Sequence, residues 1–238
     1  MATHPPGTIK PRDRFFYIAM AVVAASLVFT GFARTYYLRH LFTNAPLKPL
    51  LHLHGFLFTS WLVLLLAQVT LVAAKRTDLH RRLGVAGGVL AALMVVVGPI
   101  VAIHSARGEF SPLAPDALSF LVVPLFDILL FAILVAAALY YRHQPQIHKR
   151  LMLVATFALL PAAVARLPFA FIQNSGQLVE FGVNDLLLLS FVVYDTLVHR
   201  RLHPAYLWAG LLLIVSHTAC MALGGTSTWL AFAHWLTR

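Results

Sequence analysis

Seven long runs of mostly apolar residues divide this chain, and they constrain its fold more than any other feature. A helix needs about 20 apolar residues to cross the hydrocarbon core of a bilayer, since each residue advances the helix by about 1.5 Å. Every run is close to that length or longer. The sequence therefore predicts an all-α integral membrane bundle of seven transmembrane helices. The expected spans are residues 15–33, 50–74, 83–104, 117–141, 151–173, 178–197 and 205–224.

The composition supports a membrane protein and argues against a nucleic-acid partner. The chain is 60% hydrophobic and 11% charged, whereas soluble domains are about 45–50% apolar and about 25% charged. A net charge of +10 could suggest nucleic acid, but the basic residues lie in short segments between the apolar runs. That distribution sets the orientation of a membrane protein. The expected partner is the lipid bilayer, and a single cysteine excludes an internal disulfide and a thiolate cluster.

Short segments flank the expected spans. Residues 1–14 form a polar tail, which we expect to be cytoplasmic, and residues 15–224 form the transmembrane domain. Residues 225–238 form an outer segment in which 227–236 (STWLAFAHWL) is too short to span, so its tryptophans predict a short interfacial helix. The first run could instead be a signal peptide, because residues 31–33 (GFA) fit a cleavage site. Its apolar stretch is longer than in most signal peptides, and we predict a retained helix.

The distribution of lysine and arginine predicts the orientation of the helices. Twelve of these residues lie on the side of the N-terminus, five lie on the opposite side, and Arg166 falls within a span. Segments that stay in the cytoplasm carry the excess of positive charge. We therefore expect the N-terminus inside and the C-terminus outside.

One basic pattern occurs three times on the predicted cytoplasmic side. It reads LHRRL at residues 79–83, IHKRL at 147–151 and VHRRL at 198–202. Each copy comes just before a helix that is expected to run outward. We interpret the copies as anchors whose basic groups lie among anionic lipid headgroups. The alternative is an irregular internal repeat of a loop followed by an outward helix.

The three copies allow a comparison of depth in the outer half of the membrane. Gly98, Arg166 and His217 each lie eighteen residues after the histidine of one copy, so they are expected at one level. An arginine within a span is costly and almost always faces the bundle interior or a water-filled cavity. Pro161 and Pro168 flank Arg166, and each proline interrupts the hydrogen-bond ladder of a helix. The sequence therefore predicts a polar cavity in the outer half of the bundle.

The charge of Arg166 requires a partner in this environment. We expect a buried pair with Asp185, whose estimated depth is similar, and regard Asp127 as the second choice. The alternative is that Arg166 extends toward the membrane surface. The sixth run carries further polar residues on one helical face, which should point inward: Glu180, Asn184 and Asp195.

Four histidines in the outer half are candidate ligands. The first hypothesis is haem b, held between His54 and His217 on different helices, with His52 or His104 as substitutes. Arg166 would then contact a propionate. The protein would be a membrane redox carrier.

Two other functions remain open from the residues alone. One is a zinc-dependent membrane hydrolase with His54 or His52, His104 and His217 as ligands and Asp127 as base. The other is a carrier of small molecules, which could be coupled to protons. A retinal pigment is excluded, because all four lysines lie outside the spans.

Several stretches resemble a group of bacterial multi-pass membrane proteins of unassigned function. They are GFARTYYLR (31–39), LHLHGFLFTSW (51–61), LHRRLG (79–84) and RLHPAYLWAG (201–210). The resemblance covers nearly the whole chain and implies a place in the bacterial inner membrane. The HRRLG element is also loosely similar to diheme transmembrane cytochromes, in which such a loop leads into a ligand-bearing helix. This sequence lacks their two histidine pairs at two depths.

Overall fold

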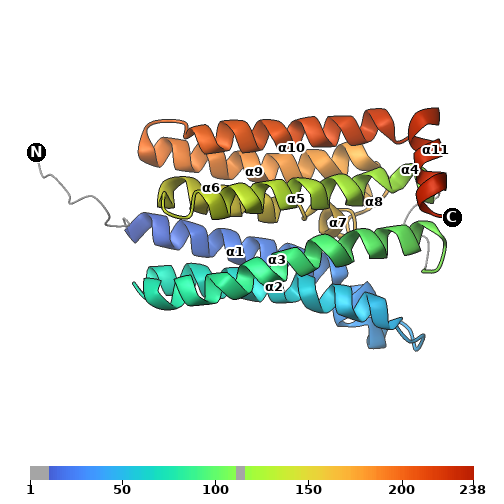
Figure 1. Ribbon diagram of the computed structural model, residues 1–238, viewed down its shortest axis with the longest axis horizontal. Helices are drawn as coiled ribbons and strands as arrows, with labels where there is room; N and C mark the ends of the chain where they lie inside the picture. The colour runs from blue at the N-terminus through green and yellow to red at the C-terminus, as the bar shows by residue number, and fades with distance from the viewer. Residues whose placement is uncertain (1–10, 111–115) are drawn as a thin grey trace, which may run out of the picture.

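A computed structural model describes residues 11–110 and 116–238, which are almost entirely helical. Seven of the described helices are long and apolar enough to cross a membrane, as the sequence predicts. They lie side by side along the long axis of the molecule (Figure 1). Of the predicted tail, residues 1–10 lie outside the described part, and the first helix already begins at Pro11.

The first three spans agree with the sequence prediction to within a few residues, apart from the earlier starts of α1 and α3. Helix α1 runs on without a break into a short π-helix, and one 3-10 turn follows before the second span. The elements are α1 (Pro11–Phe32), η1 (Ala33–Tyr37), η2 (Arg39–Leu41), α2 (Pro49–Ala73) and α3 (Thr77–Ala106).

The other four spans include several short helices near their ends. The fourth span is α4 (Ala117–Phe120) with α5 (Val122–Tyr140), and the fifth is α6 (Pro145–Phe157) with α7 (Pro161–Val164). The sixth and seventh are α9 (Gln177–His199) and α10 (Pro204–Leu223). The connection α8 (Ala170–Gln173) and the final helix α11 (Ser227–Leu236) complete the chain.

The fifth span is shorter than predicted and broken. We predicted it over residues 151–173, but α6 ends at Phe157 and the candidate span ends at Val164. Pro161 explains the break, because proline has no N–H to donate and its ring clashes with the carbonyl four residues earlier. Arg166 consequently lies in the connection after α7 and not inside a helix.

The bundle has two distinct ends. We name one the basic end, after the basic copies there, and the other the cavity end, after the cavity described below. The basic end is where α1 and α6 begin and α9 ends, and the cavity end carries η1, α7, α8 and α11 (Figure 1). Between them lies a core of fully buried side chains, which includes Met94, Phe131 and Phe157. Large apolar side chains such as Val85 and Val89 on α3 are exposed, which is compatible with contact to lipid.

The three basic copies do not share one environment. LHRRL and IHKRL lie in the first turns of α3 and α6, whereas VHRRL spans the end of α9 and the following loop. Arg82 and Arg201 are exposed, but Arg150 at the matching position is only 2% exposed. The interpretation of all three as surface anchors is therefore wrong for Arg150.

Candidate functional site

A cavity of about 620 Å³ opens into the cavity end of the bundle. Its walls come from α1, α2, α3, α5, the α6–α7 break and α9, so both halves of the chain contribute. The lining is mostly apolar and aromatic, with a few polar groups. Ligand sites in proteins have this character and volumes of about 300–1,000 Å³.

The cavity brings together several residues that the sequence marked. His54 on α2, Asp127 on α5, Arg166 after α7 and Glu180 on α9 all line it, together with Gly98 on α3. These residues are far apart in the chain. Ionisable groups in membrane spans are expected to face such a cavity. The structure has a cavity at this end with Arg166 on its wall, and the predicted place of that cavity in the outer half of the membrane stays a prediction.

Arg166 has a different environment from the one that we expected. Its guanidinium donates to the carbonyl of Ala162 and lies 4.8 Å from the ring centroid of Phe32. Among the described residues no carboxylate forms an ion pair with it, and Glu180 shares its cavity. The structure places Asp185 beside the Nδ1 of His217 at 3.0 Å instead.

Two polar atoms in the cavity wall are buried without a hydrogen-bond partner in the described part of the chain. They are Nδ1 of His54 and Oδ1 of Asp127, whose side chain is only 5% exposed. The His54 ring stacks on Phe58 with 4.1 Å between centroids, which fixes its plane. Buried polar atoms in native proteins are almost always paired with protein, water or ligand. Two residues of the cavity wall therefore each carry a buried polar atom whose hydrogen-bonding capacity is unused.

The floor of the cavity is held by hydrogen bonds between spans. Nε1 of Trp61 donates to Oγ1 of Thr156 at 3.2 Å, and that hydroxyl donates to the carbonyl of Met152 at 3.0 Å. Nearer the mouth, the hydroxyls of Tyr37 and Thr59 are 2.9 Å apart. These bonds hold the lining side chains in place and fix the shape of the cavity.

The other three candidate histidines do not line the cavity. His217 is 2% exposed and stacks on Phe181, whose ring does contribute to the wall. Nδ1 of His104 lies 2.8 Å from a carboxylate oxygen of Glu109 at the surface, and His52 is exposed. The expected haem pair of His54 and His217 is thus not assembled around one cavity.

The zinc hypothesis depends on three ligands in one place. Within residues 11–110 and 116–238 no group of three His, Cys, Asp or Glu side chains is arranged to hold a metal ion. The described side chains of His54, His104 and His217 have separate surroundings, as given above. The structure therefore does not bring the proposed zinc ligands together.

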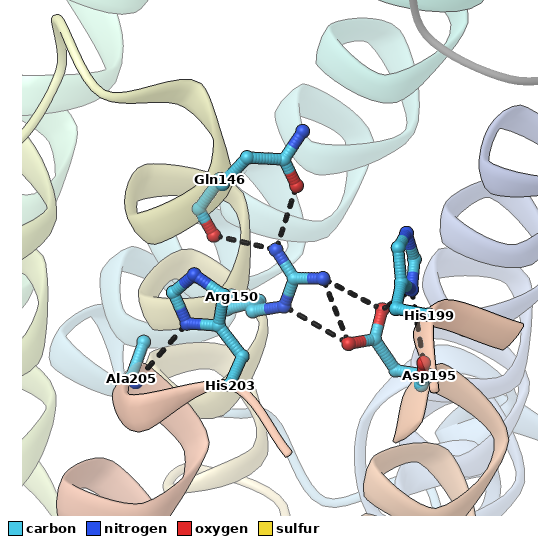
Figure 2. A network of polar contacts seen from close by, with 6 residues as sticks. All are labelled: Gln146, Arg150, Asp195, His199, His203 and Ala205. Atoms are coloured by element: carbon cyan, nitrogen blue, oxygen red, sulfur yellow. Dashed lines mark hydrogen bonds and ion pairs between the residues drawn. The ribbon is translucent and has the colours of Figure 1, made fainter. Parts of the chain in front are cut away.

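A second polar cluster lies at the basic end, and sequence reasoning missed its central residue. Arg150 on α6 forms a bidentate ion pair with Asp195 on α9, with N–O distances of 2.8 to 3.0 Å (Figure 2). Both side chains are 2% exposed. Nη1 of Arg150 also donates to the backbone carbonyl and the side-chain oxygen of Gln146, each at 2.8 Å. The buried position of Asp195 confirms the inward face that we predicted for it.

Two histidines complete this cluster (Figure 2). Nδ1 of His199 lies 2.9 Å from the carbonyl of Asp195 and 3.4 Å from its carboxylate. His203 accepts a hydrogen bond from the backbone of Ala205 and caps the N-terminus of α10. Burial, and then the nearby guanidinium of Arg150, lower the pKa of His203 below its ordinary value.

Comparisons of the chain with protein-family models, curated proteins and solved structures return no match. The seven long apolar helices fit the class of multi-pass membrane proteins, and no family is shown. The resemblance noted from the sequence stays a prediction. Function has to be argued from the geometry of the site, since a fold alone does not imply one.

Proposed function

We propose that this protein is a multi-pass protein of the bacterial inner membrane that binds a small amphipathic molecule in its cavity. The excess of basic residues on the N-terminal side supports an orientation with the N-terminus in the cytoplasm. The cavity then opens in the outer half of the membrane. Helix α11 follows the last span and carries two tryptophans, as expected of a helix at the outer interface.

One observation supports this function most directly: two residues that each carry a buried, unpartnered polar atom line the same apolar cavity. Nδ1 of His54 and Oδ1 of Asp127 are both buried, and their residues line the same 620 Å³ space. An apolar pocket with a few convergent polar groups is the usual form of a small-molecule site. The apolar lining would hold the body of the ligand, and these atoms would bind its polar head.

The charges on the wall indicate the kind of head group. The lining has three basic and three acidic side chains, so it has no net formal charge apart from His54. A head that is uncharged or zwitterionic suits such a balance better than an ion of one sign. The residues are Arg39, Lys48, Arg166, Asp127, Glu109 and Glu180.

Haem b is a second candidate because of one observation in the same cavity. His54 has a buried ring nitrogen without a partner, and Arg166 on the same wall could contact a propionate. Haem would supply redox chemistry, and His54 would be the residue that holds its iron. Absorption spectra of purified protein, oxidised and then reduced with dithionite, test this candidate. A Soret band that disappears in His54→Ala supports it, and a featureless spectrum from cells that make haem contradicts it.

Thermal unfolding with a matched set of octyl compounds tests the main proposal. Octan-1-ol, N-octylglycine, octanoate and octylamine share one chain and differ in head-group charge. A compound at a hundred times its Kd stabilises the folded state by about 2.7 kcal/mol. That corresponds to a rise in Tm of roughly 5–10 °C for a chain of this size. We expect the larger rises with the uncharged and zwitterionic heads.

A pair of alanine variants shows whether the effect arises in the cavity. Ala162 lines the cavity, so Ala162→Leu should reduce the rise in Tm by filling the space. Ala170 is exposed and does not line it, so Ala170→Leu should respond as the wild type does. Equal Tm values for the wild type with and without every compound would contradict the proposal.

A further inference from the structure

We propose that the protein transports its ligand across the membrane, and that the Arg150–Asp195 pair is the gate on the cytoplasmic side. The inference rests on the proposed function, since it takes the cavity to be the ligand site. It adds a second opening, which is closed in this structure. The argument uses the position of the pair, its helices and its alternative partners.

One helix, α6, carries both a residue of the cavity wall and a partner of the ion pair. Thr156 lies in the floor of the cavity, and Arg150 lies six residues earlier on α6. Six residues of helix span about 9 Å. Leu153 and Val154, which lie between these two residues on α6, are apolar and buried.

Side chains from four spans meet at the basic end of the bundle. The pair joins α6 to α9, and the guanidinium of Arg150 lies 5.6 Å from the ring centroid of Tyr206 on α10. On the neighbouring side, the ammonium of Lys149 lies 4.8 Å from the ring centroid of Tyr17 on α1. Separation of α6 from α9 would open this end toward the cavity floor.

Each partner of the ion pair has a second partner on its own helix. Nη1 of Arg150 is already bound by Gln146, four residues earlier on α6. The carboxylate of Asp195 lies 3.4 Å from Nδ1 of His199, four residues later on α9. A buried charge that loses its only partner is strongly unfavourable. When the two helices separate, Arg150 keeps its contact with Gln146 and Asp195 keeps the 3.4 Å approach of His199. Water that enters the opened end would solvate both charges, which a buried charge left in a closed bundle does not gain.

The chain also provides a hinge beyond Arg150, at the α6–α7 break in the cavity wall. Helix α6 ends at Phe157, and three residues outside regular helix precede α7. Helix α7 is fixed against α1, because a Cβ on Gly31 would collide with the backbone carbonyl of Ala163. The α6 segment that carries Arg150 can therefore tilt while α7 stays in place.

A permanent structural ion pair is the competing explanation, and the accessibility of a reporter cysteine distinguishes the two. The reporter is Leu153→Cys in a Cys220→Ala background, since Leu153 is 4% exposed between pair and cavity. A membrane-impermeant maleimide is added to inside-out vesicles, which present the basic end in the proposed orientation. A gate that opens transiently gives slow but measurable labelling of the reporter.

The decisive variant is Arg150→Leu combined with Asp195→Leu. Two apolar side chains are well tolerated in place of a buried ion pair. Their contact favours the closed arrangement of α6 and α9, because separation would expose both side chains to water. We expect labelling to fall by roughly tenfold or more, as for a shift toward the closed state. Arg201→Gln is the control, because that arginine is exposed at the matching position of another copy. It should label like the reporter alone.

Equal labelling rates in the double-leucine variant and the reporter protein would overturn the gate, as would no labelling of either. A circular-dichroism melting curve confirms that the variant is folded. The result is independent of ligand binding, which the octyl compounds measure. A Tm rise without gated labelling refutes transport alone, and gated labelling without a Tm rise refutes the cavity as ligand site.

Discussion

Removal of the Asp195 carboxylate is expected to destabilise the protein strongly. The side chains of Asp195 and Arg150 are both 2% exposed, and three N–O contacts join them. Asp195→Ala leaves a buried guanidinium with Gln146 as its remaining partner. Breaking such a pair from one side costs about 3–5 kcal/mol. At roughly 2–4 °C per kcal/mol for a chain of this size, Tm should fall by roughly 6–20 °C.

The native cysteine provides the assay for this prediction. Cys220 is the single cysteine and is 1% exposed, so a thiol-reactive fluorophore reports unfolding in detergent. Arg201→Ala is the matched control and should leave Tm unchanged, because its side chain is exposed. A Tm for Asp195→Ala within 2 °C of the wild type, by roughly the same scale, would refute the reasoning that the pair is buried and coupled.

Three further predictions follow from contacts elsewhere in the bundle. Gly31→Ala should lower the free energy of unfolding by about 1–3 kcal/mol through overpacking, whereas Gly210→Ala, with no neighbour within 4 Å, should not lower it; denaturation curves measure both. Trp61→Phe should lower the free energy of unfolding by about 1 kcal/mol, because it removes the indole N–H that donates at the cavity floor. In a background in which Thr156 is already replaced, Trp61→Phe should lower Tm less. An equal loss of Tm in both backgrounds would contradict this origin. The hydrogen bond from His104 lowers the pKa of Glu109. This hydrogen bond therefore contributes its full stability above the ordinary glutamate pKa, and the contribution is lost as pH falls through the lowered pKa. His104→Ala should raise that pKa toward its ordinary value in an NMR titration, with the nearby Lys48 and Arg107 still lowering it.

The positions of most spans could be predicted because bilayer thickness sets the length of an apolar run. The fifth span was the exception, since a proline-broken run has the same composition as a continuous one. Pro161 was noted in the sequence, but its effect depends on whether neighbouring helices satisfy the freed backbone. The break moved Arg166 out of the helix. Its expected pairing with Asp185 was argued from equal depth along a continuous helix, and that premise did not hold.

The residues of the cavity were easier to predict than their partners. His54, Asp127 and Arg166 line it because ionisable groups within spans avoid lipid, which is a rule that a sequence can apply. Partner choice depends on the rotation of each helix, which composition does not reveal. Arg150 was counted as a surface charge because its span was predicted to begin at residue 151. The helix begins at Pro145, so Arg150 lies within the packed bundle.

The central claim is that the cavity binds a small amphipathic molecule, and the contents of purified protein test it most directly. Protein purified in mild detergent is extracted with organic solvent, and the extract is analysed by mass spectrometry. The account predicts a compound that accompanies the wild type and Ala170→Leu but is depleted from Ala162→Leu. Identical extracts from all three proteins would contradict it.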